Sequence, residues 1–249
     1  MRLPHKNERQ YSWAFSGVSQ SWMKSRIAAK FAERSDTQNE QIVLLSFSLT
    51  STMSRIITDM KVQTGRPTGE MSWSTKLKKA KKKDVETVPG ASVVSNVCTG
   101  SEAQQYIDMC EHFGFTEAPL SVGIGKAIMD KSTRDNERVM WDCPEDECQV
   151  LWERLKPHFP TNTYVMGHLW EACGLNERFR FYRCKLHPTL PHLTADDTQQ
   201  VFAPHFDGCF PRNDQEVSHF TLLIYLSEGF EGGHTNFFPG RDLNKFVSV

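Results

Sequence analysis

The chain has 249 residues, a formal net charge of −1 at pH 7 and a hydrophobic fraction of 39%. This composition predicts a soluble protein of one or two domains, with no overall charge that would favour a polyanion or a membrane surface. The seven cysteines are odd in number and irregularly spaced. They predict reduced thiols rather than a disulfide framework, and therefore an intracellular and, by default, cytoplasmic location.

The first 90 residues show no clear core pattern. The first 34 residues have the basic, Ser-containing composition of an organelle transit peptide, although Pro4 and Glu8 count against one. The most apolar run, Ile42 to Leu49, is far shorter than the roughly 18 residues of a membrane-spanning helix. From Gln63 to Gly90 the chain is polar and rich in lysine, which predicts a flexible linker. Its lysine run has no interleaved aromatic residues and is only a weak signal for nucleic-acid binding.

Regular patterns begin after residue 90. Ser101 and Gln104 have the spacing of a capping box and open a predicted helix that Gly114 ends. One face of this helix carries the apolar residues Ala103, Tyr106, Ile107 and Cys110. A second helix is predicted from Pro144 to about Lys156, with Val150, Leu151 and Leu155 buried, and a short strand is predicted from Arg138 to Trp141.

Strand patterns follow Gly174. Phe179 and Phe181 alternate with polar residues, and further extended runs are Phe202 to Asp207, Phe220 to Leu226 and His234 to Phe238. Helices followed by closely spaced strands predict an α+β domain whose helices cover one face of a β-sandwich or barrel. We therefore predict a largely disordered region at residues 1–90, including the lysine-rich linker, and one domain at residues 91–249.

The predicted second strand contains an H-x-D motif, His205 and Asp207. Alternation along a strand places both side chains on one face, where an imidazole nitrogen and a carboxylate oxygen can bind one metal ion. These are two ligands of a 2-His-1-carboxylate facial triad. Such a triad leaves three positions on iron(II) for a bidentate 2-oxo acid and dioxygen.

Four blocks occur in a fixed order around this motif. They are Leu175 to Arg183 (LNERFRFYR), Phe202 to Gly208 (FAPHFDG), Thr221 to Leu226 (TLLIYL) and Phe230 to Phe238 (FEGGHTNFF). Together they resemble the prolyl 4-hydroxylase-like family of iron(II)- and 2-oxoglutarate-dependent dioxygenases. Fainter similarity upstream extends the resemblance to roughly residues 100–238.

The resemblance implies a double-stranded β-helix, or jelly roll, that binds iron(II) through the H-x-D and a distal histidine. Such enzymes decarboxylate 2-oxoglutarate and use O2 to hydroxylate an unactivated C–H bond, with ascorbate keeping the iron reduced. The partners implied are 2-oxoglutarate and a protein or small-molecule substrate, with peptidyl proline as the family-level expectation.

The family's functional residues match single positions of this chain. His205 and Asp207 match the first two iron ligands. Tyr182 matches a tyrosine near the metal and the 2-oxoglutarate, and Tyr225 matches one whose hydroxyl helps to hold the distal carboxylate. Thr221 and Leu223 share strand parity with Tyr225, which predicts that they line the same pocket. The alternative for both tyrosines is a structural role, in which the aromatic ring packs in the core and the hydroxyl lies at the edge of the core.

Three upstream residues have two open interpretations. Arg134, Asn136 and Arg138 belong either to a loop over the substrate groove or to a solvated charged turn before a strand.

The chain also departs from the family. The distal histidine and the Arg or Lys that pairs with the distal carboxylate are not found, and only 249 − 238 = 11 residues follow Phe238. We therefore expect a truncated core without its closing strands, with impaired activity and self-association through open sheet edges. His234 is the candidate third ligand, at a place where the family usually has Glu, and His219 is a second candidate.

Three functions remain open on the sequence alone. The first is the dioxygenase. The second is a catalytically silent remnant that binds a partner, for instance along an exposed sheet edge. The third is a metal-binding module that uses His205, Asp207 and His234 without 2-oxoglutarate chemistry.

Overall fold

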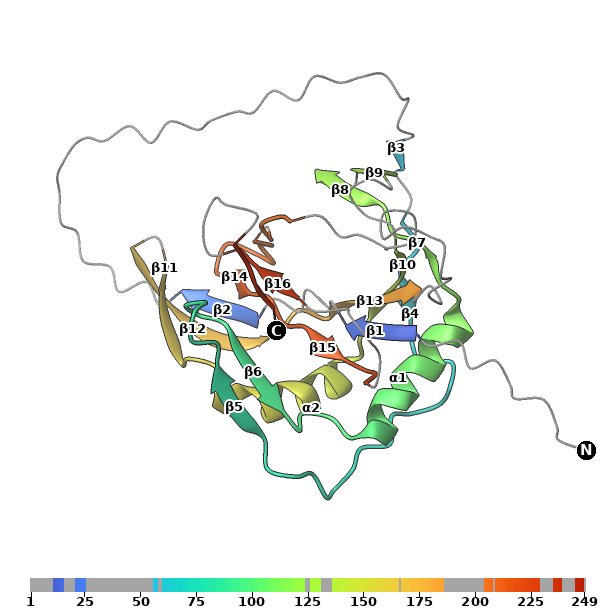
Figure 1. Ribbon diagram of the computed structural model, residues 1–249, viewed down its shortest axis with the longest axis horizontal. Helices are drawn as coiled ribbons and strands as arrows, with labels where there is room; N and C mark the ends of the chain where they lie inside the picture. The colour runs from blue at the N-terminus through green and yellow to red at the C-terminus, as the bar shows by residue number, and fades with distance from the viewer. Residues whose placement is uncertain are drawn as a thin grey trace, which may run out of the picture.

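The structure is a computed structural model that places strands from distant parts of the chain around two helices (Figure 1). It describes residues 11–15, 21–25, 56–57, 60–123, 126–130, 136–165, 167–185, 204–207, 209–228, 235–238 and 245–248. These residues form an α+β fold, as the sequence predicts, in which open sheets dominate and helices are few. The closure of such sheets into a double-stranded β-helix stays a prediction.

The largest sheet, here called the main sheet, has six strands. Its order is β15 (Ile224–Tyr225), β1 (Tyr11–Phe15), β13 (Arg178–Lys185), β10 (Glu137–Asp142) and β4 (Gln63–Thr64), with β7 (Thr116–Glu117) also paired with β10. β10 and β13 are antiparallel, and their register joins Arg138 to Tyr182 and Val139 to Phe181. The predicted strands at Arg138 to Trp141 and at Phe179 to Phe181 are therefore confirmed.

The second sheet has four strands in the order β11 (Asn162–Val165), β12 (His168–Leu175), β2 (Ser21–Ser25) and β14 (Glu216–Phe220). Three smaller sheets consist of β3 (Ile56–Ile57), β9 (Lys126–Ile128) and β8 (Leu120–Gly123), of β5 (Lys81–Asp84) and β6 (Ser92–Ser95), and of β16 (Asn236–Phe237) and β17 (Val247–Ser248). Both N-terminal strands are interior: β1 lies between β13 and β15, and β2 lies between β12 and β14. Residues 11–15 thus contribute to the main sheet and residues 21–25 to the second sheet.

Both predicted helices are present, with small corrections to their ends. They are α1 (Gly100–Phe113) and α2 (Glu145–Leu155), and α2 continues into a 3-10 turn, η1 (Lys156–His158). The capping box of α1 uses Thr99 and Glu102 rather than Ser101 and Gln104, because Thr99 Oγ1 accepts from the Glu102 amide and the Glu102 carboxylate accepts from the Thr99 amide. In α2, Leu151 and Leu155 are buried as predicted, whereas Val150 is half-buried.

The hydrophobic core lies between these helices and one face of the main sheet. Because side chains alternate along a strand, Phe179 and Phe181 of β13 share this face with Val139 and Trp141 of β10. The ring of Tyr106 on α1 packs on this face, with its centroid 5.8 Å from that of Phe181. The helices thus cover one side of the main sheet, as the sequence predicts, and Figure 1 shows them together on that side.

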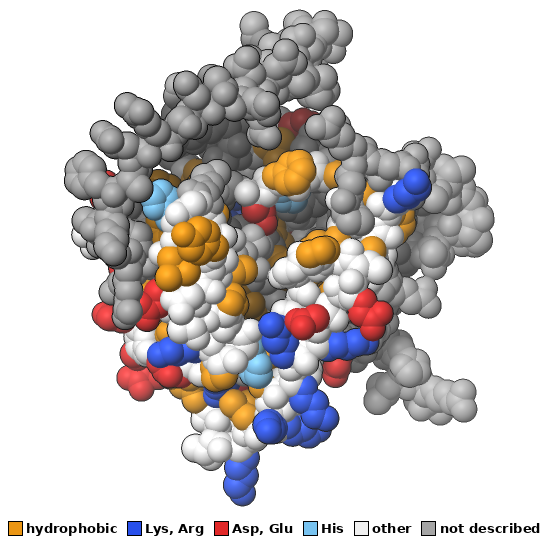
Figure 2. Space-filling view, turned by 90° about the vertical axis from the view of Figure 1, so that its left-hand side faces the viewer, with side chains coloured by type: hydrophobic (Ala, Val, Ile, Leu, Met, Phe, Trp, Pro, Cys, Tyr) orange, Lys and Arg blue, Asp and Glu red, His pale blue; other side chains and the backbone are white. Residues whose placement is uncertain are grey.

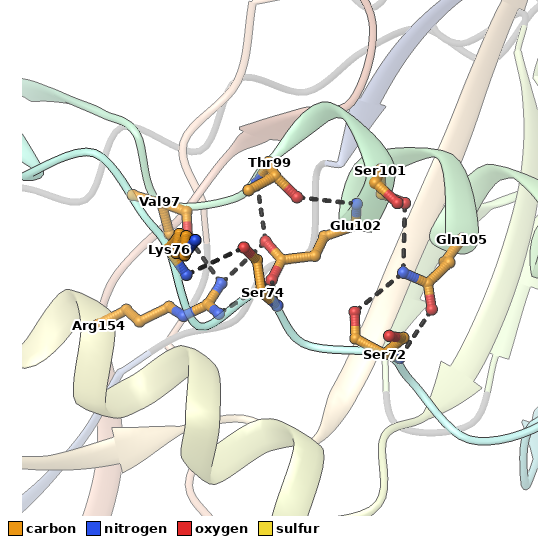
Figure 3. A network of polar contacts seen from close by, with 9 residues as sticks. All are labelled: Ser72, Ser74, Lys76, Val97, Thr99, Ser101, Glu102, Gln105 and Arg154. Atoms are coloured by element: carbon orange, nitrogen blue, oxygen red, sulfur yellow. Dashed lines mark hydrogen bonds and ion pairs between the residues drawn. The ribbon is translucent and has the colours of Figure 1, made fainter.

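A buried ion pair joins the two helices at the start of α1 (Figure 3). Arg154 on α2 donates to both carboxylate oxygens of Glu102 at 3.0 Å, and the Glu102 side chain is 1% exposed. The backbone amide of Ser74 donates to the same carboxylate at 2.8 Å. Burial alone would raise the pKa of Glu102, but the hydrogen bonds from Arg154, Thr99 and Ser74 lower it below its ordinary value.

Residues 63–76 differ from the flexible linker that composition predicts. Arg66 forms a buried ion pair with Glu147 of α2, with 3.2 Å between Nε and Oε2, and its guanidinium lies over the ring of Tyr106. Ser72 exchanges hydrogen bonds with Gln105 on α1 (Figure 3). These partners lie far downstream in the chain, so composition within the segment carries no sign of them. The lysines of β5 are exposed, as predicted for the solvated lysine run.

Two further predictions concern thiols and membranes. Among the cysteines whose side chains the structure describes, Cys98, Cys110, Cys143, Cys148 and Cys209 are free thiols, as predicted. Among the residues that the structure describes, no helix has the length and apolar character needed to cross a membrane.

We predict that Phe181→Ala lowers the free energy of unfolding by about 3–5 kcal/mol, because it removes a fully buried ring and leaves a cavity. Urea denaturation followed by circular dichroism measures the change. Phe206→Ala is the matched control, since the Phe206 side chain is fully exposed and should change stability by less than about 0.5 kcal/mol. Equal effects of the two variants would contradict the position of Phe181 in the core.

We also predict a pH-dependent loss of stability on Glu102→Gln. Because the folded-state pKa of Glu102 is lowered, its stabilisation is complete above its unfolded pKa of about 4.3 and disappears as the pH falls through the lower folded value. Breaking this buried pair should cost about 3–5 kcal/mol at pH 7. The difference between wild type and variant should then shrink in urea titrations at pH 5, 4 and 3.

The control for this titration is Glu153→Gln on α2, the helix that carries Arg154, where the exposed Glu153 accepts a hydrogen bond from Gln149. It should change the stability little at any pH. A Glu102→Gln variant whose stability follows that of Glu153→Gln across the pH range would show that the ion pair does not stabilise the fold.

Candidate functional site

The H-x-D motif lies in a short irregular segment rather than in a strand. The sequence predicts a strand from Phe202 to Asp207, but the described part, residues 204–207, has no ladder pairing. Pro204 contributes to this difference because it has no amide to donate to a neighbouring strand. The two polar side chains nevertheless meet, with 3.3 Å between His205 Nε2 and Asp207 Oδ1, while Phe206 between them is fully exposed.

Thr221 fixes the second oxygen of the aspartate. Its hydroxyl donates to Asp207 Oδ2 at 2.7 Å, while Oδ1 is the oxygen that faces His205. Thr221 follows the last residue of β14, so the second sheet determines where this hydroxyl lies. Both motif side chains stay about 40% exposed, at 42% for His205 and 40% for Asp207. The pair is therefore ordered by a neighbour and still accessible to a ligand.

One face of the main sheet points away from the helices. On β13 this face carries Arg180 and Tyr182, which alternate with the core residues Phe179 and Phe181. Burial lowers the pKa of Arg180 below its ordinary value, and the charges of Tyr182 and Asp207 oppose this lowering. We call this side of the main sheet the polar face.

A row of residues crosses the polar face in register. Arg138 on β10 pairs with Tyr182 on β13, Tyr182 pairs with Ala14 on β1, and Ala14 pairs with Tyr225 on β15. Paired residues project to the same face of a sheet, so Tyr182 and Tyr225 share the polar face two strands apart. The structure thus brings together the two tyrosines that the sequence proposes for one site.

The two tyrosines differ in their surroundings. Tyr182 is buried at 5% exposure, whereas Tyr225 is 42% exposed and its hydroxyl shares a hydrogen bond with Thr235. Thr235 immediately follows the candidate ligand His234, which itself lies outside the described residues. The hydrogen bond therefore brings the chain next to His234 to the edge of the polar face.

The parity argument for Thr221, Leu223 and Tyr225 needs a correction. The sequence predicts one strand from Phe220 to Leu226, but β14 ends at Phe220 and β15 begins at Ile224. Alternation does not extend across the residues between them, where Leu222 packs against the core. Leu223 is half-buried.

His219, the second candidate for a third ligand, faces a different neighbour. Its ring packs edge-on against Trp170 of β12, with 4.7 Å between the centroids. Burial lowers the pKa of His219 below its ordinary value. Within the described part of the chain, no group of three His, Cys, Asp or Glu side chains is placed to hold a metal ion.

The surroundings of two arginines differ from what the sequence predicts. The sequence places Arg138 in a groove loop or in a solvated charged turn, but it lies within β10 and is 8% exposed. Arg180 was noted only as a polar residue that alternates with Phe179 and Phe181. The available signal was the alternation itself, because it places Arg180 on the same face as Tyr182.

The described pair of donors fits two neighbouring positions on an octahedral ion. Metal bonds of about 2.1 Å at a right angle separate two donor atoms by about 3 Å. The 3.3 Å between His205 Nε2 and Asp207 Oδ1 is close to this separation. The arrangement can therefore contribute one imidazole and one carboxylate to a divalent metal ion, with Thr221 orienting the carboxylate.

The surroundings of the site include exposed apolar side chains. On the face shown in Figure 2, hydrophobic side chains form separate patches around a hollow, and most of the charged side chains lie below and beside them. Among the described residues, the large hydrophobic side chains that are exposed include Phe206, Phe210 and Tyr225. Phe206 in the H-x-D motif and Tyr225 in β15 thus add apolar surface to the polar groups described above.

Comparison of the chain with protein-family models, with curated proteins and with solved structures found no match.

We predict that Thr221→Val weakens the binding of Mn²⁺ by about tenfold, because loss of a group that orients a metal ligand typically costs 10–100-fold in affinity. His205→Ala should weaken binding further, since it removes a donor. Isothermal titration calorimetry with MnCl2 measures both. Thr163→Val on β11 is the control, because the Thr163 hydroxyl has no hydrogen-bond partner among the described residues. Unchanged affinity in Thr221→Val would show that Asp207 is not a ligand.

Proposed function

We propose that this chain is an iron(II)- and 2-oxoglutarate-dependent dioxygenase of the prolyl 4-hydroxylase type, which hydroxylates a C–H bond. The observation that carries the proposal is the meeting of His205 and Asp207, with Nε2 and Oδ1 3.3 Å apart, in a chain whose main sheet holds Tyr182 and Tyr225 on one face. The four residues that the family resemblance selects come from three separate blocks of sequence. The contact between the two candidate ligands and the shared face of the two tyrosines support a common site.

In this proposal His205 and Asp207 are two of the three protein ligands of iron(II). His234 is the candidate for the third, because the chain next to it is hydrogen-bonded to Tyr225 through Thr235. Thr221 is a positioning residue, since it holds one oxygen of Asp207 and leaves the other toward His205. When bound, iron(II) together with 2-oxoglutarate and O2 supplies the oxidising power for the reaction.

The residues of the polar face have different roles. Tyr182 is buried beside Arg180 and orients groups within the site. Tyr225 is exposed enough to contact a ligand, and its hydroxyl is held by Thr235. Phe206 and Phe210 offer apolar surface to a protein or small-molecule substrate, with peptidyl proline as the leading class. The proposal includes ascorbate as the reductant that maintains iron(II).

We expect a visible charge-transfer band when the purified chain is titrated anaerobically with iron(II) and 2-oxoglutarate. His205→Ala and Asp207→Ala should abolish the band, because each removes one of the metal donors. The matched control is His112→Ala, since His112 is exposed in the last turn of α1 and away from the motif. Conversion of 2-oxoglutarate to succinate under air should follow the same order among the variants.

A folded wild-type chain that binds iron(II) without giving the band would contradict the dioxygenase and favour a metal-binding module. A band that survives His205→Ala would show that the iron is held elsewhere.

A further inference from the structure

Among the described strands, β5 and β6 form a two-stranded ribbon that pairs with no other sheet (Figure 1). The two strands are antiparallel, and their register begins with Lys81 opposite Ser95. Just outside this pair, the side-chain amide of Asn96 donates to the backbone carbonyl of Lys79 at 3.1 Å. The lysine-rich part of the segment that composition predicts to be a linker is therefore a hydrogen-bonded hairpin.

The two faces of the ribbon have different surroundings. Val94 packs against the hydrophobic core, so the face that it shares with Lys82 is the one turned toward the protein. The opposite face, here called the outward face, is open to solvent. Its four side chains are all exposed, and they are Lys81, Lys83, Val93 and Ser95.

The lysines on the ribbon and just before it concentrate positive charge in a chain whose formal net charge is −1. Six lysines lie within eight positions, and all six are exposed: Lys76, Lys78, Lys79, Lys81, Lys82 and Lys83. Among the described residues only Lys82 of these six has a carboxylate partner, with 3.4 Å between its Nζ and Asp84 Oδ1. The other five ammonium groups are therefore available to an external anion.

The composition of the ribbon indicates which polyanion it fits. Residues 76–95 contain no aromatic side chain, so the bases of a single-stranded nucleic acid have nothing on which to stack. Lysines bind the phosphates of a duplex without any stacking. The outward face also has no Arg, Asn or Gln, the side chains that make paired hydrogen bonds to guanine and adenine. Its contacts are thus with phosphates, which carry no sequence information.

The shape of the ribbon favours one kind of duplex. The major groove of B-DNA is wide enough to admit a two-stranded β-ribbon. The major groove of an A-form RNA helix is deep and narrow, and side chains do not enter it. A ribbon with one face open to solvent and lysines along its first strand therefore matches DNA better than double-stranded RNA.

We propose that the ribbon of β5 and β6 is a binding surface for duplex DNA, and that Lys81 and Lys83 contact its phosphates whatever the base sequence. The lysines at 76, 78 and 79 extend the same positive surface along the strand of DNA. None of these residues belongs to the candidate metal site, so the proposal stands apart from the dioxygenase.

The test is fluorescence anisotropy of a labelled, mixed-sequence DNA duplex titrated with the full chain over a series of salt concentrations. The double variant Lys81→Gln with Lys83→Gln should bind at least about tenfold more weakly at low salt, because two phosphate contacts are lost. It should also reduce the slope of log affinity against log salt concentration by about 2. Unchanged affinity and slope in this variant would overturn the proposal.

The matched control is Lys61→Gln with Lys156→Gln, which removes the same charge from two exposed lysines outside the ribbon. This pair should leave affinity and slope close to those of the wild type. Equal weakening by both double variants would show that net charge, rather than the ribbon, binds DNA. Lys81→Arg with Lys83→Arg keeps both charges and should bind like the wild type.

Other polyanions serve as competitors in the same titration. Single-stranded DNA of the same sequence, double-stranded RNA and vesicles containing phosphatidylserine should each compete more weakly than unlabelled duplex DNA at equal salt. Stronger competition by any of them would overturn duplex DNA as the partner.

The outcomes are distinguishable from those for the proposed function. His205→Ala, which should abolish the charge-transfer band, should bind duplex DNA with wild-type affinity. Loss of DNA binding in His205→Ala would place the DNA surface at the H-x-D motif and overturn the role of the ribbon.

Discussion

The two-residue alternation of β13 against β10 is the constraint on which the rest of the structure depends. Within β13, Phe179 and Phe181 point to the helices, while Arg180 and Tyr182 point to the opposite face. A shift of one residue in this pairing would exchange the two sets, because alternation moves every side chain to the other face. The same register therefore determines both the hydrophobic core and the polar face.

The sequence predicted those parts of the fold that depend on local periodicity. The helix at Gly100–Phe113 and the strand at Arg178–Lys185 follow from residue spacing within each segment. Contacts between distant segments were not predictable in this way. The ion pair of Arg154 with Glu102 and that of Arg66 with Glu147 join segments 52 and 81 residues apart, and neither partner has a sequence signal for the other.

The candidate site shows the same division. The closeness of His205 to Asp207 was predictable because they lie two residues apart, even though the described backbone between them is not a strand. The hydrogen bond from Thr221 to Asp207 joins residues 14 positions apart, and residue spacing within either segment carries no sign of it. The break between β14 and β15 was missed because Thr221, Leu222 and Leu223 have the composition of a continuous strand.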